Sequence, residues 1–202
     1  MSGYSIFLRP FETEDYILIN KWRNNLTNQK FTVGPIRYVS LEREKTWVQE
    51  KMMNNNKDIY WAICLNDGSR RMIGYTSLND IDHINKKCGV GGIVIGENDC
   101  RDGVSMFEVA LIKMDFAFNQ LNINRLVAYS LYDHPITPGT VYALGFKEEG
   151  IMRDYVYKNG RYQDVIIYSL LKREYEELLK NNELQISKVI KRFSLYNKNA
   201  KV

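Results

Sequence analysis

The chain has few of the residues that would build a metal centre or a disulfide framework. Its 202 residues include three cysteines, none of them in a CxxC spacing, and two histidines, His83 and His134, which lie far apart. Few residues are therefore available for a zinc site or a histidine-based catalytic triad. We predict no metal site, reduced cysteines and a cytoplasmic location.

Long apolar segments and strong charge of one sign are also lacking. No run approaches the roughly 20 apolar residues that a membrane helix needs, and the N-terminal sequence has no basic region followed by an apolar stretch, so we predict no signal peptide. The formal net charge of +4 suits an anionic ligand but is too small to argue for nucleic acid. We expect neither nucleic acid nor a membrane as a partner.

Linkers and internal repeats are absent from the sequence as well. Hydrophobic residues make up 45% of the chain, an ordinary globular proportion, so we predict one domain over residues 1–180. Residues 181–202 are polar and basic, and we expect a solvated appendage, although the apolar residues between 186 and 193 allow one or two amphipathic turns. Contact between copies of the chain, giving a homodimer, is the alternative for this tail.

Strand and helix patterns alternate along the chain. The predicted order is strand 5–8, helix 14–24 capped by Thr13, helix 41–53 capped by Ser40, strands 59–65, 72–78 and 89–95, helix 104–118, strand 125–131, helix 140–144, strands 146–157 and 162–170, and helix 172–179. The predicted fold is α/β (α+β), a mixed and mostly antiparallel sheet of about seven strands flanked by helices. Asn159-Gly160 is its last hairpin turn.

The segment 92–118 is the most informative part of the sequence. A short apolar strand, Ile93-Val94-Ile95, precedes a polar loop containing Arg101 and Gly103, and an amphipathic helix follows. The N-terminus of a helix carries unpaired N–H groups and a partial positive charge, so it can hold a phosphate. Gly103 lets the backbone come close to a ligand, and Arg101 adds a full charge. We expect a phosphorylated ligand to bind here.

Two strings near the C-terminus resemble a known family. YALGFKEEG at 142–150 and VYKNGRYQDV at 156–165, completed by Ser169, are similar to the YxxLGFxxEG and xYxNGxYxDxxxxS patterns of the GCN5-related N-acetyltransferases (GNAT family), although the first string has one residue fewer between its tyrosine and its leucine. The similar branch contains ribosomal-protein N-terminal acetyltransferases and amino-sugar acetyltransferases. The resemblance spans roughly residues 5–179 and includes two further strings, Leu8-Arg9-Pro10 and Trp22-Arg23-Asn24.

The resemblance implies acetyl-CoA as co-substrate and direct transfer of its acetyl group to a primary amine, with no covalent enzyme intermediate. It implies that the pantetheine arm adds alongside the strand Ile93, Val94 and Ile95. The pyrophosphate would then sit on the loop and helix start, at Arg101, Gly103, Val104 and Ser105.

The sequence departs from the family pattern in two places. Counted without a gap, the two small positions of the phosphate loop fall on Val104 and Met106, where Met106 would crowd the ligand. One extra helical residue places Gly103 and Ser105 there instead, and we favour this second register. The asparagine that often contacts the CoA arm is replaced by Pro135.

Acetyl transfer needs a proton for the leaving thiolate, a polarised thioester carbonyl and a base for the amine. Tyr142 matches the family's proton donor, and a phenol is protonated at neutral pH; the alternative is that Tyr142 packs beneath Phe146. A strand N–H near Val94 or Ile95 would polarise the carbonyl. The family's glutamate position is occupied here by Val90. Four residues and a chain of waters remain as alternative bases, the residues being Asp80, Asp82, His83 and Glu97.

Trp22, Arg23 and Asn24 match the region that shapes the acceptor site in the family. An arginine there suits a phosphate or carboxylate, which favours an amino sugar carried on a nucleotide over the amino terminus of a protein. A core tryptophan beside a surface arginine is the alternative interpretation. A second hypothesis for the whole chain is a non-catalytic acyl-CoA-binding module, which the altered loop and Pro135 motivate.

Overall fold

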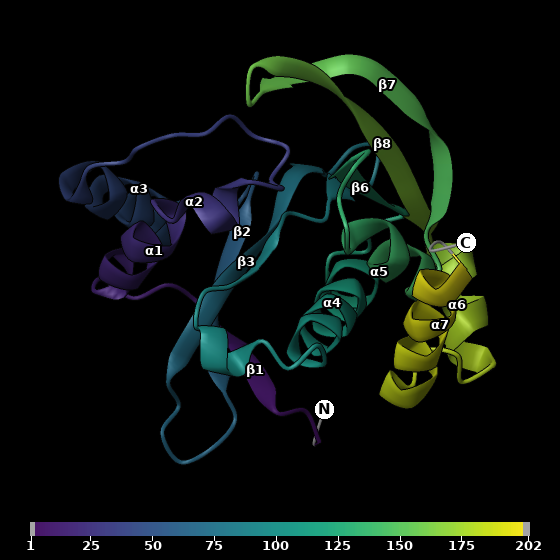
Figure 1. The fold of residues 1–202 in the computed structure, drawn as a ribbon. Helices are drawn as coiled ribbons and strands as arrows, with labels where there is room; N and C mark the ends of the chain where they lie inside the picture. The colour runs from purple at the N-terminus through teal and green to yellow at the C-terminus, as the bar shows by residue number, and fades with distance from the viewer. Residues whose placement is uncertain (1–2, 200–202) are drawn as a thin grey trace.

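The computed structural model describes residues 3–199, and a twisted sheet of eight strands runs through them (Figure 1). The strands are β1 (Ile6–Arg9), β2 (Ile59–Leu65), β3 (Met72–Asp82), β4 (Lys87–Gly89), β5 (Ile93–Ile95), β6 (Arg125–Leu131), β7 (Lys147–Lys158) and β8 (Arg161–Leu171). The helices are α1 (Asp15–Arg23), α2 (Leu26–Gln29), α3 (Leu41–Met53), α4 (Ser105–Asp115), α5 (Thr137–Ala143), α6 (Lys172–Lys180) and α7 (Ile186–Asn199).

The strand order is β1-β2-β3-β4-β6-β8-β7, with β5 paired to β3 beside β4. Every pairing is antiparallel except β4 with β6. The predicted fold class is therefore confirmed. The sheet has one strand more than expected because the predicted strand 89–95 is divided into β4 and β5.

Side-chain alternation along β2 explains why helices cover both faces of the sheet. Ala62 and Cys64 face the cluster formed with α1 and α3, whereas Ile63 faces the cluster that includes Val109 of α4. Figure 1 shows the same arrangement, with α1, α2 and α3 on one side of β1–β3 and α4 on the other.

Several local predictions can be compared with the structure directly. Ser40 caps α3, because its Oγ accepts the N–H of Arg43 at 3.3 Å, and Asn159 and Gly160 both have positive φ, at 54° and 81°, as the predicted turn requires. Thr13 is not the cap of α1, which starts after Glu14. There the carboxylate of Asp15 accepts the Glu12 N–H at 2.8 Å instead.

The helix after β6 begins earlier than predicted, at Thr137 instead of 140. Pro138 fits because the first helical positions need no N–H partner. The Nδ1 atom of His134 accepts the N–H groups of Ile136 and Thr137, at 3.1 and 3.0 Å, and so closes the helix start. His134, which the sequence places in a loop, is thus a structural cap.

The segment after α6 is not a solvated appendage, which corrects the prediction for residues 181–199; residues 200–202 of the predicted tail lie outside the described part. Leu184 and Val189 are buried in the same core cluster as α4 and α5. Arg192 donates from Nε and Nη2 to the carbonyl of Ala143, at 2.9 and 2.7 Å, and so caps the C-terminus of α5. The amphipathic spacing that the sequence shows in this segment forms a full helix because α4 and α5 offer it an apolar surface.

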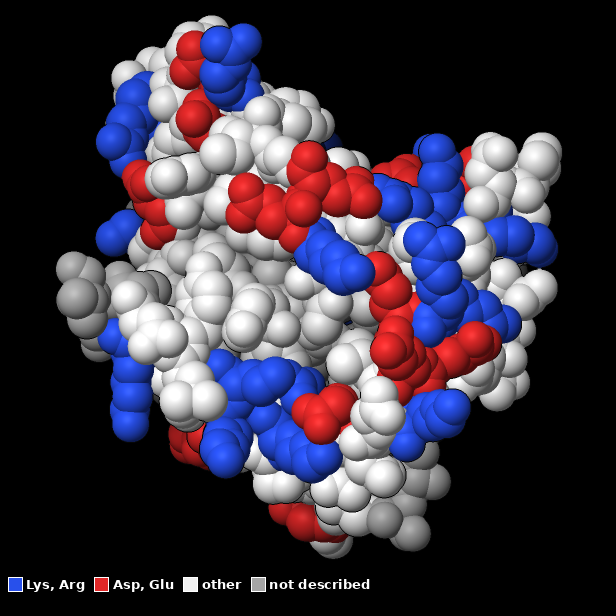
Figure 2. All heavy atoms as spheres, turned by 90° about the vertical axis from the view of Figure 1, so that its right-hand side faces the viewer, with Lys and Arg blue, Asp and Glu red and all other residues white. Residues whose placement is uncertain are grey.

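Charges of both signs are interspersed on the face of the molecule that Figure 2 shows. Among residues 3–199, no helix is long and apolar enough to cross a membrane. No three His, Cys, Asp or Glu side chains of this part gather in a group that could hold a metal ion. The three cysteines are buried and unpaired.

The packing of α7 predicts unequal effects of truncating two of its apolar residues. Val189 is fully buried and Leu195 on the same helix is 50% exposed. We expect Val189→Ala to lower the free energy of unfolding by about 2 kcal/mol, because it removes buried methyl groups. Leu195→Ala should stay within about 0.5 kcal/mol of the wild type. Urea denaturation measures both, and equal, negligible effects would contradict the packed arrangement.

Candidate functional site

The parallel pair β4–β6 comes apart after three residues. Gly89 is level with Val127, and the N–H of Val90 still donates to the carbonyl of Val127 at 2.8 Å. Beyond this point β5 pairs only with β3, and β6 from Ala128 to Leu131 pairs only with β8. The sheet therefore opens between two strand edges that lack a strand partner in residues 3–199, and such edges can accept an extended ligand.

Three residues, Val90-Gly91-Gly92, turn the chain from β4 into β5, and buried side chains hold their carbonyls. The ammonium of Lys113, on α4, donates to the carbonyl of Gly91 at 2.8 Å and to Oγ1 of Thr76 at 2.9 Å. The hydroxyl of Thr76 donates in turn to the carbonyl of Gly92 at 3.0 Å. Both carbonyls are thus drawn towards α4 and β3, away from the opening.

Burial gives Lys113 an unusual titration. The residue is 2% exposed, and loss of hydration lowers the pKa of its ammonium from 10.5 to about 7. A side chain at Gly91 would require Asn79 and Ser77 to move, because its Cβ would lie 2.0 Å from Asn79 Oδ1 and 2.1 Å from Ser77 Oγ. The sequence signal for Lys113 is a single charge within the apolar run 109–114 of α4, and the sequence-based prediction did not use it.

The three β5 residues predicted to bind the donor present their side chains to opposite faces. Ile93 and Ile95 pack in the cluster that contains Val109 of α4, whereas Val94 packs with Trp22 on the side of α1 and α3. The edge available to a ligand is thus backbone, and the side chain of Val94 lies on the face covered by α1 and α3.

The N-terminus of α4 follows the loop after β5 and already holds a carboxylate. Oδ1 of Asp102 accepts the N–H groups of Val104 and Ser105, at 2.8 and 2.9 Å, and Oδ2 accepts the hydroxyl of Ser105 at 2.9 Å. Burial raises the pKa of Asp102, but these hydrogen bonds outweigh it and the pKa is lowered, so the group is charged at neutral pH. This cap was not foreseen from the sequence.

The remaining residues of the predicted phosphate loop differ in whether the protein already occupies or binds them. Gly103 has φ +75°, and a Cβ there would meet nothing within 4 Å, so space lies open beside its backbone. Met106 packs against the core. Arg101 donates from Nε to the carbonyl of Ile95 at 3.1 Å and from Nη2 to Oδ1 of Asn28 at 2.8 Å, linking the loop to the segment before α3.

Tyr142 lies on α5 and is 55% exposed. Its ring centroid is 5.2 Å from that of Tyr196 of α7. At this exposure Tyr142 is not a core residue, and Tyr196 is an aromatic ring that it packs against. Its hydroxyl makes no hydrogen bond within residues 3–199.

A cavity of about 300 Å³ lies on the opposite face of the sheet, under α1 and α3. Aromatic rings and arginines line it together with a loop segment, and the lining residues are Trp22, Arg23, Asn28, Gln29, Thr32, Pro35, Arg37, Val39, Arg43, Trp47, Tyr75 and Val94. Because Val94 belongs to β5, the cavity reaches the strand on one side of the opening.

The predicted acceptor residues Trp22, Arg23 and Asn24 have separate roles around this cavity. Trp22 is buried, its Nε1 donates to Oε1 of Glu97 at 2.9 Å, and its ring stacks on Tyr75. Arg23 forms an ion pair with the fully buried Glu44 at 3.0 Å. Asn24 does not line the cavity but pairs through its amide with the backbone of Val39, which does.

The structure brings none of the four predicted base residues into the cavity lining. Hydrogen bonds from Trp22 and Lys21 lower the pKa of Glu97, which weakens it as a base. Asp80 and Asp82 lie at the end of β3 that pairs with β4 instead of β5. His83 Nε2 contacts the carbonyl of Asn56 at 3.0 Å.

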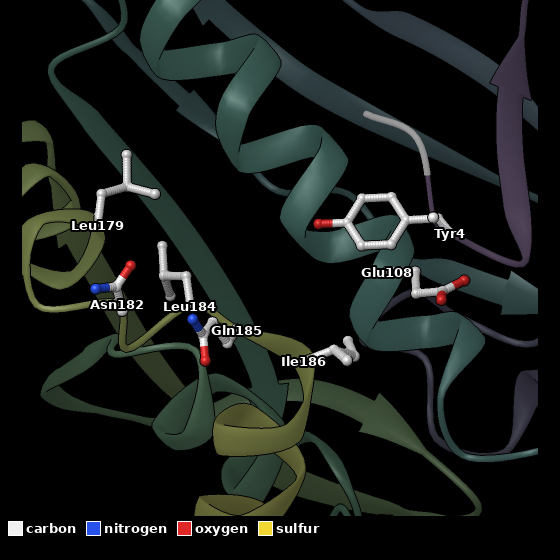
Figure 3. A pocket seen from close by; sticks show the side chains of 8 residues that line it. Tyr4, Glu108, Leu179, Asn182, Leu184, Gln185 and Ile186 are labelled. Carbon is white, nitrogen blue, oxygen red and sulfur yellow. The ribbon is translucent and has the colours of Figure 1, made fainter.

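A second cavity, of about 470 Å³, lies between the start of the chain, α4 and the link from α6 to α7. Figure 3 shows Tyr4 and Glu108 on one side and residues 179–186 on the other. The carboxylate of Glu108 accepts both the N–H and the hydroxyl of Ser5, at 3.0 and 2.7 Å. Glu108, the one acidic residue that lines this cavity, thus holds the N-terminal segment in place.

A sheet that divides between two parallel strands above a helix N-terminus is typical of the acyl-CoA-dependent transferases. The chain matches the acetyltransferase (GNAT) domain family over residues 5–147. It belongs to this family of acetyltransferase enzymes, which confirms the resemblance and the enzyme class expected from the sequence.

Several known proteins are similar to the chain. The uncharacterized N-acetyltransferase p20 of Bacillus licheniformis is 28% identical over 169 residues, 83% of this chain and 93% of p20. YdaF of Bacillus subtilis, named as a candidate ribosomal N-acetyltransferase, is 34% identical over 113 residues, 55% of this chain and 59% of YdaF. The crystal structure of a Vibrio cholerae spermidine N-acetyltransferase with CoA and spermine has a TM-score of 0.77 at 22% identity, covering 86% of this chain and 99% of that one.

The buried ammonium of Lys113 predicts a specific dependence of stability on pH. Its folded pKa of about 7 lies below the unfolded value of 10.5, so between these values the unfolded state binds more protons and stability rises with pH. From pH 7 to 9.5 we expect the unfolding free energy of the wild type to rise more steeply than that of Lys113→Met, by up to about 1.4 kcal/mol per pH unit.

Urea denaturation over this pH range measures the difference. The control is Lys87→Met, which removes an exposed lysine of β4 and should follow the slope of the wild type. Parallel curves for the wild type and Lys113→Met would contradict a depressed pKa at Lys113.

Proposed function

We propose that the chain transfers the acetyl group of acetyl-CoA directly to a primary amine, with the donor in the opening between β5 and β6 and the acceptor in the cavity under α1 and α3. The observation that carries this proposal is the position of Val94, which belongs both to the free strand edge and to the cavity lining. A donor on that edge and an amine in that cavity would meet at β5.

The residues proposed for the donor fit an extended arm ending in a pyrophosphate. The edge formed by Ile93, Val94 and Ile95 offers backbone groups to the arm. The open space at Gly103 and the inward packing of Met106 support the register with Gly103 and Ser105 at the phosphate. In this arrangement Arg101 would have to give up its bond to Asn28 in order to reach a phosphate.

Acetyl-CoA supplies the thioester. A carbon–nitrogen bond forms to the amine while the carbon–sulfur bond breaks, and a β5 N–H near Val94 or Ile95 would stabilise the oxygen that becomes negative. Tyr142 is the proposed proton donor to the departing sulfur, with its proton replaced from solvent. Since no candidate base lines the cavity, we propose that the proton of the amine leaves through water.

Two acceptor classes remain for the proposal, an amino sugar and the amino terminus of a protein. The name of YdaF is consistent with the second, whereas the spermidine enzyme acts on a polyamine. The cavity volume of about 300 Å³ favours a small molecule over a folded protein. A cytoplasmic location and a homodimer also remain proposals.

The catalytic role of Tyr142 predicts a large loss of turnover. Tyr142→Phe should lower kcat by about 100-fold, since it removes the acid and little else, with the KM for acetyl-CoA nearly unchanged. Release of free thiol with a panel of amines measures this. Tyr196→Phe is the control because it removes the neighbouring hydroxyl, and it should retain wild-type kcat.

The outcome also separates the proposed enzyme from a non-catalytic acyl-CoA-binding module of the same fold. A binding module would be stabilised thermally by acetyl-CoA but would release no thiol with any amine. An unchanged kcat in Tyr142→Phe would remove Tyr142 from the mechanism and leave the transfer reaction standing.

The carboxylate of Asp102 predicts that donor binding can be strengthened. A pyrophosphate at the N-terminus of α4 would meet this charge, and Asp102→Asn keeps a good cap while removing it. We expect the Kd of CoA to fall by about fivefold at low salt. Asp99→Asn, in the same loop and paired with Arg71, is the control. Calorimetric titration with CoA measures both, and unchanged or weaker binding in Asp102→Asn would contradict the proposed phosphate position.

A further inference from the structure

We propose that the acceptor of this protein carries a phosphate, which Arg37 and Arg43 bind at the rim of the cavity under α1 and α3. This inference deepens the proposed function and rests on it for the reacting amine. It excludes polyamines as good acceptors, although a spermidine N-acetyltransferase is among the similar proteins.

The charges that line the cavity are all positive, and one of them is neutralised. Arg23, Arg37 and Arg43 are its charged lining residues. Arg23 is paired with Glu44 at 3.0 Å, and its guanidinium lies 4.0 Å from the centre of the Trp47 ring. The charge of Arg23 is thus balanced by a carboxylate that is itself fully buried and cannot reach a ligand.

Arg37 and Arg43 remain available. Within residues 3–199, neither guanidinium forms a salt bridge or a hydrogen bond, and both residues are exposed. Arginine presents several N–H donors in a planar fork that matches a phosphate. The cavity therefore offers two free arginines beside an aromatic floor of Trp22, Trp47 and Tyr75.

The backbone that carries Arg37 is held firmly in place. The side chain of Gln29 accepts the N–H of Arg37 at 2.7 Å and donates to its carbonyl at 3.0 Å. The ammonium of Lys158, at the tip of the β7–β8 hairpin, donates to the carbonyls of Gln29, Thr32 and Gly34, at 2.6, 2.5 and 3.0 Å. The free guanidinium thus extends from a fixed loop, an arrangement that reduces the entropy lost on binding.

A polyamine would be repelled by the charges that line this cavity. Its cationic groups would approach two unpaired guanidinium groups, and the one nearby carboxylate, Glu44, is already paired and buried. Like charges brought together in a partly desolvated site are repelled. An amine whose far end is a phosphate instead gains an attraction at the rim while its nitrogen points to Val94.

Binding can be tested without the reaction. Glucose 6-phosphate and UDP-glucose carry no amine, and they stand for a sugar phosphate and for a nucleotide-linked sugar. Titrated calorimetrically into the CoA-bound protein, at least one should bind, and glucose should bind at least about tenfold more weakly. The stronger of the two probes identifies the source of the phosphate. Binding of neither would overturn the proposal.

Kinetics test the same residues in the reaction. Thiol release is measured with glucosamine 6-phosphate, glucosamine and spermidine. If the sugar phosphate is the stronger binding probe, kcat/KM should be highest for the phosphorylated amine. Arg37→Gln and Arg43→Gln should each raise its KM by about tenfold with little change in kcat, and leave glucosamine unaffected. The control is Arg173→Gln, an exposed arginine of α6, which should match the wild type.

If UDP-glucose is the stronger probe, the two substitutions are judged by its Kd, which each should raise about tenfold. Preference for spermidine, or full binding of the phosphate probes by the double variant Arg37→Gln/Arg43→Gln, would overturn the proposal. Failure of the proposed function looks different. In that case no amine releases thiol from the wild type, while the binding of phosphate probes and its loss in the double variant still decide the role of the two arginines.

Discussion

The opening of the sheet depends on how three residues, Val90-Gly91-Gly92, are held. A strand that simply continued would stay paired with β6 and close the sheet. Here the ammonium of Lys113 and the hydroxyl of Thr76 bind the carbonyls of Gly91 and Gly92, so the chain leaves β6 after one last hydrogen bond. The energetic cost is a buried cation with a strongly lowered pKa. The result is a pair of free strand edges placed beside a helix N-terminus.

Opposite charges lie on the two sides of this opening. On the side of α4, Asp102 occupies the helix N-terminus with a carboxylate, so the donor phosphate proposed for this position would compete with a group of the protein itself. On the side of α1 and α3, Arg37 and Arg43 are free while Glu44 is neutralised by Arg23. The proposal of an anionic acceptor rests on this distribution of charge; a structure of similar fold holds spermine instead.

Most of the fold follows from local patterns. Short apolar runs identified β2 and β6 at their observed bounds, and Asn159-Gly160 identified the last hairpin, because these signals depend on neighbours in sequence. The tail after Lys180 was misjudged, since its helix forms only where α4 and α5 cover Val189. The sequence also did not predict that strand 89–95 divides in two. The hydrogen bonds that divide it come from Thr76 and Lys113, which are distant from it in sequence.

For the site, the sequence by itself determined the family and the position of the β5–α4 junction, because motifs carry these in consecutive residues; the role of Tyr142 stays a prediction. Only the tertiary structure decided which arginines are free. The sequence favoured Arg23 as the acceptor-binding group, but Glu44 reaches it across the interface of α1 and α3. Arg37 and Arg43 belong to no motif. Arg37 lines the cavity because Gln29 and Lys158 fix the loop between α2 and α3, and Arg43 lines it from the first turns of α3. Ion pairing depends on distances between elements, which no local pattern specifies.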